Sequence, residues 1–228
     1  MSSRQTRRIN NLLVVCVLIA SVLVTLAFGV NIVSVAAKTT TSSGDTLDVQ
    51  KGLLKNDQYV IGNNPTDFQK ETFQELTNSL KENDPYLICE QVVRNFIADY
   101  YTWTNKDGNY EVGGLQYLYG PKFTLFQNKA RWEFYKDLDL YISQYGRKEL
   151  LEVDSIETTP AVDNGNYEIN GEAYPSYYVE AHWTYKNTKL DTSGFQKTGY
   201  YTVINRDGRY EIVSMFESWG EPGEGVGE

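Results

Sequence analysis

Two side chains of this sequence have the chemistry of a nucleophile and its general base: Cys89 and His182, the single histidine of the chain. A thiol becomes an effective nucleophile when an imidazole accepts its proton and a third group orients the imidazole ring. The sequence offers no third group at a defined position, and one histidine excludes every mechanism that needs two imidazoles. We therefore predict no catalytic residues of the Cys–His type.

Three acidic residues that lie close together, Glu149, Glu152 and Asp154, are candidates for metal binding because carboxylate oxygens bind Ca²⁺ and Mg²⁺. A calcium-binding EF-hand loop places its ligands at alternating positions around a central glycine. These acids do not follow that spacing. The sequence therefore predicts no metal site.

The C-terminal residues 220–228 are rich in glycine, but they differ from a phosphate-binding loop. In such a loop the glycines are followed by a lysine that contacts the phosphates. Here acidic residues, and no lysine, lie among the glycines, and they would repel a phosphate group. We expect a disordered acidic tail over residues 220–228 and predict no cofactor. The glycines are Gly220, Gly223, Gly225 and Gly227.

The composition is typical of a folded acidic domain. The chain has 228 residues, a formal net charge of −9, and 18 Tyr, 9 Phe and 4 Trp residues. Its 41% of hydrophobic residues are enough for a core, and two cysteines exclude a disulfide-rich scaffold. Phosphate binding requires an excess of Lys and Arg, which this chain lacks. We therefore expect no direct sequence-specific binding of nucleic acid.

The uneven distribution of charge predicts a membrane anchor. Residues 1–37 contain three arginines and no acid, whereas residues 38–228 have a net charge of −12. Residues 12–37 carry no charge, and about 20 apolar residues suffice to cross the roughly 30 Å hydrocarbon core of a bilayer. We therefore predict a transmembrane helix over residues 12–37. Its apolar positions include Leu12, Val17, Val24, Phe28 and Val33.

The arginines predict the orientation of this span. They are Arg4, Arg7 and Arg8. Positively charged residues next to a span stay in the cytoplasm, so residues 1–11 are expected to form a cytoplasmic tail. The chain is then a single-pass protein of the cell membrane whose C-terminal domain is extracytoplasmic. Cys89 is the only cysteine after the span, and an exported domain without a disulfide suits a Gram-positive surface.

A cleaved signal peptide is the alternative to a retained anchor. Residues 35–37 are small and would form an acceptable cleavage site. The apolar region of a signal peptide usually has about 7–15 residues, which is shorter than this segment. We interpret Cys16 as an apolar residue of the span rather than as a site of lipid attachment. Both alternatives export the remainder of the chain.

Apolar spacing in the remainder predicts helices followed by strands. Residues 38–65 are polar and aperiodic, which predicts a stalk. Periods of three and four residues then predict three helices, at residues 67–81, from Asp84 and Pro85 to a turn at residues 105–108, and at residues 121–146. Phe96 and Phe134 fall on the inner faces of two of these helices.

After Gly146 the apolar period changes to two, which predicts about four strands. They cover residues 150–162, 177–185, 195–204 and 210–216, and Asp207 with Gly208 forms a hairpin turn between the last two. Helices followed by consecutive antiparallel strands define an α+β domain, in which the helices cover one face of a curved sheet. We place this domain at residues 66–219.

The alternation of the strands also identifies candidate interface residues. Tyr178 and His182 fall on one face of their strand, opposite Trp183. Adjacent tyrosines at 177–178 and 200–201 must point to opposite faces, so Tyr178 and Tyr200 are candidates for the outer face. Tyrosine is enriched at protein interfaces. The alternative is that these rings only cover the open side of the sheet.

The order of elements resembles the nuclear transport factor 2-like fold. The resemblance lies in residues 85–103, 121–145 and the strands that end at Phe216. Together with the arginine-flanked anchor and the polar stalk, the chain is similar to the VirB-eight/TcpC-like subunits of type IV secretion and conjugation systems. The resemblance implies a non-enzymatic, membrane-anchored scaffold of an envelope-spanning DNA-transfer channel. Its partners would be the membrane, other subunits of the secretion complex and further copies of itself.

The same fold also includes small enzymes, such as ketosteroid isomerases and dehydratases, which place an Asp base and Tyr donors inside the cone. Asp99, Tyr100 and Tyr101 could imitate such a group. At helical spacing, however, Tyr100 belongs to the buried stripe, and Asp99 lies about 100° away from it. We expect Asp99 to be solvated or salt-bridged. The alternative functions are an exported ligand-binding protein or a small enzyme that uses the cone as a pocket.

Overall fold

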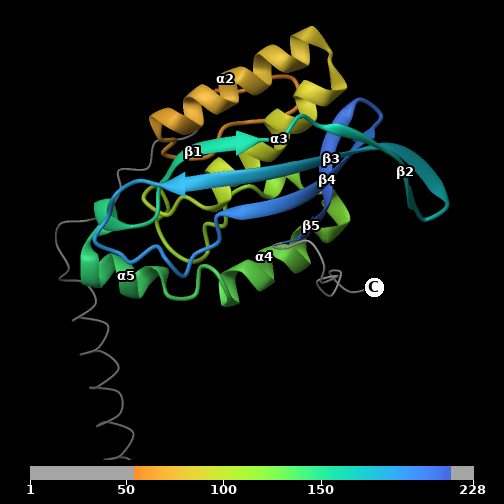
Figure 1. Cartoon of the computed structure of the whole chain (residues 1–228). Helices are drawn as coiled ribbons and strands as arrows, with labels where there is room; N and C mark the ends of the chain where they lie inside the picture. Colours follow the sequence, from red (N-terminus) through yellow and green to blue (C-terminus); the bar gives the residue numbers. More distant parts are fainter. Residues whose placement is uncertain (1–53, 217–228) are drawn as a thin grey trace, which may run out of the picture. The chain divides into compact units, whose positions relative to one another are not determined.

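The computed structural model describes residues 54–216, in which helices come first and strands follow (Figure 1). The helices are α2 (Asp67–Glu82), α3 (Pro85–Tyr100), α4 (Phe123–Trp132) and α5 (Leu138–Tyr145), with short 3-10 helices η1 (Leu115–Tyr117), η2 (Gly120–Lys122) and η3 (Arg147–Glu149). The strands are β1 (Val153–Thr158), β2 (Val162–Ile169), β3 (Glu172–Tyr185), β4 (Thr198–Arg206) and β5 (Arg209–Phe216). This confirms the α+β class with an antiparallel sheet.

Side-chain caps fix the start of the first two helices, as their sequences predict. The Thr66 hydroxyl accepts a hydrogen bond from the backbone N–H of Gln69, and the Gln69 side chain accepts one from the N–H of Thr66. The Asp84 carboxylate caps α3 by accepting from the N–H of Tyr86. Each cap satisfies an N–H group that has no partner inside the helix. The two predicted helices are confirmed.

The third predicted helix is wrong, because residues 121–146 form two helices with a break between α4 and α5. Tyr135 lies in this break and is fully buried. Its hydroxyl donates to the carbonyl of Tyr100 at 2.6 Å and accepts from the N–H of Gly113 at 3.2 Å.

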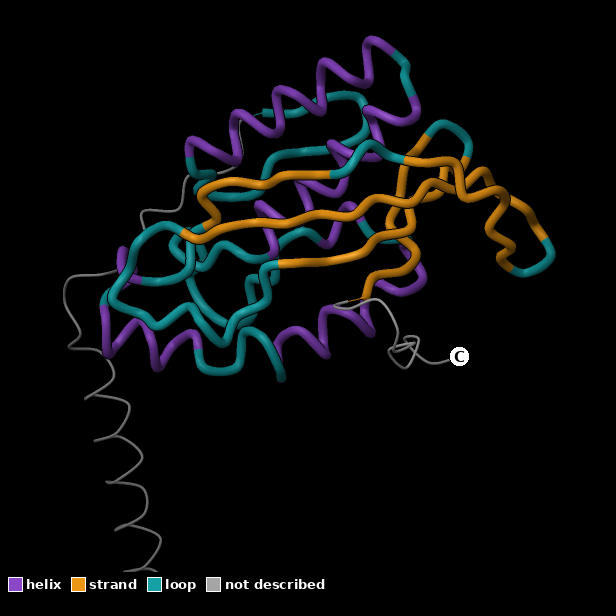
Figure 2. Tube along the Cα trace, in the orientation of Figure 1, coloured by secondary structure: helices purple, strands orange, loops and turns teal. Residues whose placement is uncertain are grey.

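The sheet has five strands, not four, and β3 is its centre. β3 pairs with β4 along one edge, and β5 pairs with β4. Along its other edge, the first half of β3 pairs with β2 and the second half with β1. The strand predicted over residues 150–162 is therefore wrong, because it merges β1 with the start of β2. Figure 2 shows the β2–β3 hairpin extending beyond the helices.

Glycine-containing turns connect these strands. Asn170 and Gly171 have φ of 53° and 83° and join β2 to β3, and Asp207 and Gly208 have φ of 54° and 87° and join β4 to β5. Two central residues with positive φ give the turn whose twist matches that of the strands, and Asn-Gly and Asp-Gly favour it. The predicted turn at Asp207–Gly208 is confirmed. The turn at Asn170–Gly171 was not predicted, although its sequence carries the same signal.

Aromatic rings fill the space between the helices and the inner face of the sheet. Phe96 of α3 stacks on Tyr100 with ring centroids 5.3 Å apart and meets Tyr201 of β4 edge-on at 5.9 Å. Phe134 stacks on Tyr100 at 5.1 Å and contacts Trp103 at 4.9 Å. Phe96 is completely buried on α3, as predicted, whereas Phe134 is partly buried against the core but lies between α4 and α5 and not on a helix face.

The stalk predicted over residues 38–65 is corrected for residues 54–65, which belong to the domain. Tyr59 and Ile61 are buried in the core. The Tyr59 hydroxyl donates to the carbonyl of Tyr210 at 2.6 Å, and the Arg209 guanidinium lies 4.8 Å from the centre of the Tyr59 ring. Tyr59 thus finds its partner in β5, 151 positions away, which local periodicity does not reveal.

The membrane predictions fall on residues 1–53, outside the described part of the chain, as does the predicted tail at residues 220–228. Leu12, Arg4 and Cys16 are among the residues concerned. From residue 54 to residue 216, no helix combines the length and the apolar composition of a membrane span.

Candidate functional site

The outer face of β3 and β4 carries the three candidate interface residues. Tyr178 and Tyr200 stack with ring centroids 6.5 Å apart and planes inclined by 17°. They stand on neighbouring strands, because Tyr178 is paired with Thr202 and Tyr200 with Glu180. Both rings are partly exposed. The structure therefore places Tyr178 and Tyr200 together, as the alternation of the strands predicts.

His182 extends this face by one pair of residues. Its Nε2 lies 2.9 Å from the Glu180 carboxylate and its Nδ1 lies 3.1 Å from the Thr198 hydroxyl. His182 is more than half exposed, whereas Trp183 on the opposite side of the strand is buried. These two contacts, with a carboxylate and with a hydroxyl, thus fix the orientation of the His182 ring. The outer-face patch, defined here as Tyr178, Glu180, His182, Thr198 and Tyr200, joins flat aromatic area to polar groups, which is the chemistry of a protein interface.

Asp99 lies in the last turn of α3 and is engaged in structural bonds. Its carboxylate accepts from the Lys106 ammonium at 2.5 Å and from the backbone N–H of Gly114 at 2.7 Å. Both charged side chains are largely buried. The expectation of a salt-bridged Asp99 is confirmed, and Tyr100 belongs to the buried stripe as predicted. The pair fixes the loop after α3 onto the helix.

That loop approaches the helix so closely that glycine is required at its tip. A Cβ atom at Gly113 would lie 2.2 Å from the carbonyl oxygen of Asp99. At the start of the loop, Arg147 of η3 donates to the carbonyl of Lys106 and lies 3.5 Å from the Asp107 carboxylate. Charges inside a protein are retained only when they are paired and hydrogen-bonded. This chain of contacts holds the loop in one arrangement.

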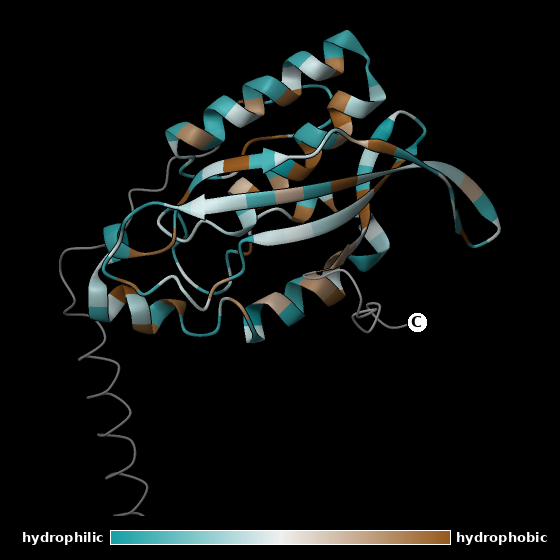
Figure 3. Cartoon of the chain, viewed as in Figure 1, coloured by the Kyte–Doolittle hydropathy of each residue, from teal (hydrophilic) through white to brown (hydrophobic). Residues whose placement is uncertain are grey.

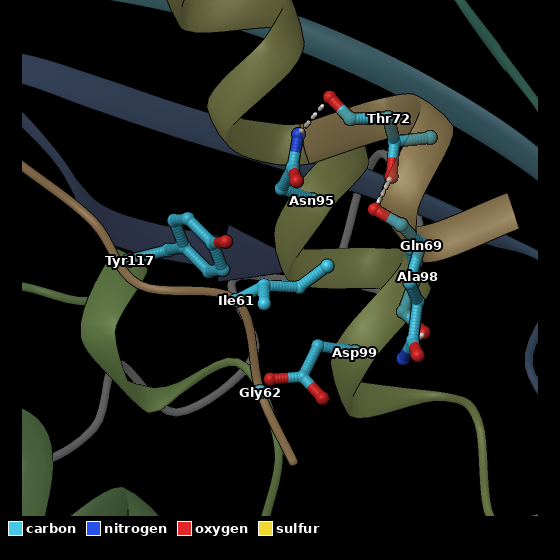
Figure 4. A pocket seen from close by; sticks show the side chains of 8 residues that line it. All are labelled: Ile61, Gly62, Gln69, Thr72, Asn95, Ala98, Asp99 and Tyr117. Atoms are coloured by element: carbon cyan, nitrogen blue, oxygen red, sulfur yellow. Dashed lines mark hydrogen bonds between the residues drawn. The ribbon is translucent and has the colours of Figure 1, made fainter. Parts of the chain in front are cut away.

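A small polar cavity adjoins Asp99 (Figure 4). It has a volume of about 10 Å³, which is room for a single water molecule, whereas pockets for organic ligands measure about 300–1,000 Å³. Around it the Gln69 side chain donates to the carbonyl of Ala98 at 3.0 Å, and Asn95 donates to the carbonyl of Thr72 at 2.9 Å. These amides satisfy backbone groups and hold α2 against α3.

The structure does not bring Cys89 and His182 together. Cys89 is fully buried on α3, which packs against the inner face of the sheet, while His182 projects from the outer face. Burial in apolar surroundings raises the pKa of the Cys89 thiol well above its usual range, with a smaller contribution from Glu90. Cys89 therefore remains a protonated thiol and acts as a packing residue.

The three neighbouring acidic residues, Glu149, Glu152 and Asp154, do not form a cluster in the structure. Glu149 lies 3.3 Å from Lys189, and the backbone N–H of Lys189 holds the pKa of the Glu149 carboxyl below its usual value. Glu152 lies 2.6 Å from Lys186. Asp154 is exposed on β1. Among residues 54–216, no three His, Cys, Asp or Glu side chains are grouped so that they could bind a metal ion.

Sequence reasoning missed the partner of Asp99 and the aromatic residue at the helix break. The sequence pattern indicates Lys106 only as part of a turn, and Tyr135 only as a helical residue, whereas both are buried. No local pattern signals either role, because a lone lysine in a polar turn is normally solvated.

The structural facts define an α+β protein with a core filled by aromatic rings and an outer sheet face that carries tyrosines. Comparisons of the chain with models of protein families, with curated proteins and with solved structures give no match.

Proposed function

We propose that the chain is a non-enzymatic, membrane-anchored scaffold of an envelope-spanning secretion complex. The observation that carries this proposal is the outer-face patch, in which the stacked rings of Tyr178 and Tyr200 lie beside His182 on a partly exposed sheet face. A surface of this kind favours binding to another protein. Aromatic rings fill the interior of the domain, which favours a structural role for the core.

The finer proposal is a nuclear transport factor 2-like domain in a conjugative type IV secretion channel of the VirB-eight/TcpC-like kind. It is supported by the order of elements, four helices before five strands within residues 54–216, and by the long central strand β3 that pairs with three others. The predicted anchor over residues 12–37 supplies the link to the membrane. Tethering raises the local concentration of the domain, so weak contacts with other subunits suffice for assembly.

The outer-face patch makes a testable prediction about assembly. Tyr178→Ala and Tyr200→Ala should each weaken complex formation about 5- to 30-fold, because truncating an interface hot spot costs about 1–2 kcal/mol. The measurement is recovery of partner subunits with the tagged full-length chain after cross-linking, with expression levels matched. Thermal melting should change by only a few degrees, because both rings already have contact with solvent.

Tyr110→Ala is the matched control, since Tyr110 is an exposed tyrosine on the loop after α3 and outside the patch. It should leave assembly unchanged. Equal recovery of partners with the wild-type chain and with both patch variants would exclude this face as the interface.

The anchor makes a second prediction, which concerns topology. In a Cys16→Ala background, Ser43→Cys should react with a membrane-impermeant thiol reagent on intact cells, or on protoplasts where a wall blocks access. Ser3→Cys should react only after the membrane is broken, because the arginines before the span stay in the cytoplasm. The reverse pattern would refute the orientation, and a mature chain that starts near Lys38 would replace the anchor by a signal peptide.

A further inference from the structure

The outer side of α4 is an unpaired apolar ridge. Ala130 faces the core, whereas Leu125 and Trp132 on the opposite side are 51% and 79% exposed. They are seven positions apart, which is two helical turns, so they lie on one line along the helix. Within residues 54–216, the Trp132 ring takes part in no hydrogen bond or ring contact. An exposed apolar patch that is rimmed by polar residues marks a candidate interaction site.

The ridge carries basic residues, although the domain is acidic. α4 has two basic residues, Lys129 and Arg131, and no acid, a net charge of +2, while the other described residues together have a net charge of −10. Of the neighbouring lysines, Lys122 donates to the carbonyl of Val213 and Lys136 lies 3.9 Å from Asp137. Lys129 lies 4.0 Å from Glu133, but both are exposed, so this ion pair contributes little and leaves the positive charge available.

α5 carries a further exposed apolar residue. Leu140 of α5 is exposed, and α4 and α5 follow one another along the side of the domain opposite to α2 (Figures 1 and 3). In Figure 3 both helices carry hydrophobic residues among the hydrophilic ones. The basic apolar ridge is defined here as Leu125, Lys129, Arg131 and Trp132 of α4.

The composition of this ridge favours a lipid surface. Trp and Arg also occur in the cores of protein interfaces, but lysine is depleted there. Helices that lie in the plane of a membrane instead combine Trp and Leu, which enter the headgroup region, with Lys and Arg, which bind anionic headgroups. The short, convex α4 also offers a ridge rather than a groove. These features match the lipid surface.

We propose that α4 docks on an anionic lipid surface through the basic apolar ridge. The inference rests on the proposed anchor in one respect. The 16 residues 38–53 between the predicted span and the described domain can extend to about 55 Å at most, at roughly 3.3–3.6 Å for each residue. The domain is thereby held close to the bilayer, and even weak lipid contacts are populated. Docking through α4 would fix which face of the domain points away from the membrane.

The test uses the full-length chain in lipid vesicles with a polarity-sensitive fluorophore at Asn128→Cys on the exposed side of α4, in a Cys16→Ala background. Cys89 is buried and stays unlabelled in the folded protein. In vesicles with anionic lipid, the emission should shift to the blue and be quenched by quencher-labelled lipid. Zwitterionic vesicles and high salt should remove both effects, because the attraction is electrostatic. A fluorophore at Gln74→Cys on α2 is the control and should respond to neither lipid.

Charge reversal of Lys129 and Arg131 to Glu should reduce the docked population about 30-fold or more, since each basic residue near an anionic surface contributes about 1 kcal/mol. Trp132→Ala should reduce it several-fold without loss of the folded state. An emission at position 128 that is identical in anionic and zwitterionic vesicles would overturn the proposal. A shift that ignores lipid charge and grows with protein density would also overturn it, in favour of a second copy of the chain.

The vesicles contain no other subunit, so this result is independent of complex assembly. Absence of docking together with loss of partners in the Tyr178→Ala variant would reject the lipid contact alone. Failure of the wild-type chain to insert into vesicles would instead reject the anchor on which the proposed function depends.

Discussion

Replacing Phe96 with alanine is expected to lower the free energy of unfolding by about 3–5 kcal/mol, through lost transfer energy and the cavity left behind. Phe96 is completely buried, and its ring contacts Tyr100, Phe126 and Tyr201 with centroids 5.3, 6.1 and 5.9 Å away. Three elements therefore lose contacts at once. A loss of this size is comparable to much of the stability of a typical domain, about 5–15 kcal/mol.

The measurement is denaturant unfolding of a fragment of residues 47–228, which form one compact unit. A fragment that starts at residue 66 is unsuitable, because it lacks Tyr59, which is buried in the core. Leu140→Ala serves as the control, since Leu140 is exposed, and should change stability by less than about 0.5 kcal/mol. If Phe96→Ala unfolds at the same denaturant concentration as the control, the packing of α3 against the sheet is not as described.

Replacing Lys106 with methionine is expected to cost about 3–5 kcal/mol, because it leaves the Asp99 carboxylate buried without its cation. Lys106 is almost fully buried and its ammonium lies 2.5 Å from that carboxylate. The remaining bond from the N–H of Gly114 compensates for only part of the lost interaction. Thermal unfolding of residues 47–228 would show the loss as a lower melting temperature.

Asp99→Asn and the double variant with Lys106→Met complete a cycle that separates a structural Asp99 from a catalytic one. The double variant should be more stable than Lys106→Met alone, because neither charge is then left unpaired. If Asp99 were catalytic, Asp99→Asn would abolish function in a transfer assay while its melting curve stays normal. That outcome would favour the enzyme over the scaffold.

The parts of the fold that sequence patterns predicted are those controlled by neighbouring residues. Thr66 and Asp84 cap α2 and α3 through hydrogen bonds to N–H groups two or three residues away, so both helices could be predicted. The face of β3 that holds Val179 and Trp183 follows from the alternation of side chains along a strand. The Asn170–Gly171 turn has an equally local sequence signal, so the hairpin that it forms could also have been predicted.

The parts that were missed depend on partners far away in the chain. Tyr135 in the helix break bonds to the backbone of Tyr100 and Gly113, and Tyr59 in residues 54–65 bonds to the backbone of Tyr210. No periodicity within a segment reports such contacts. The same holds for the candidate site. Alternation predicted that Tyr178 and Tyr200 leave the inner face, but their stacking depends on the register between β3 and β4.

The packing of the first described segment against the last hairpin also determines when the domain can finish folding. Gln58 donates to the carbonyl of Gly208, and Tyr59 to that of Tyr210, across separations of 150 and 151 residues. During synthesis this segment emerges first, and its partners emerge almost last. The contacts form only when β4 and β5 are both available, and closing so long a loop is slow. In the exported chain that we propose, this final closure waits until nearly the whole domain has crossed the membrane.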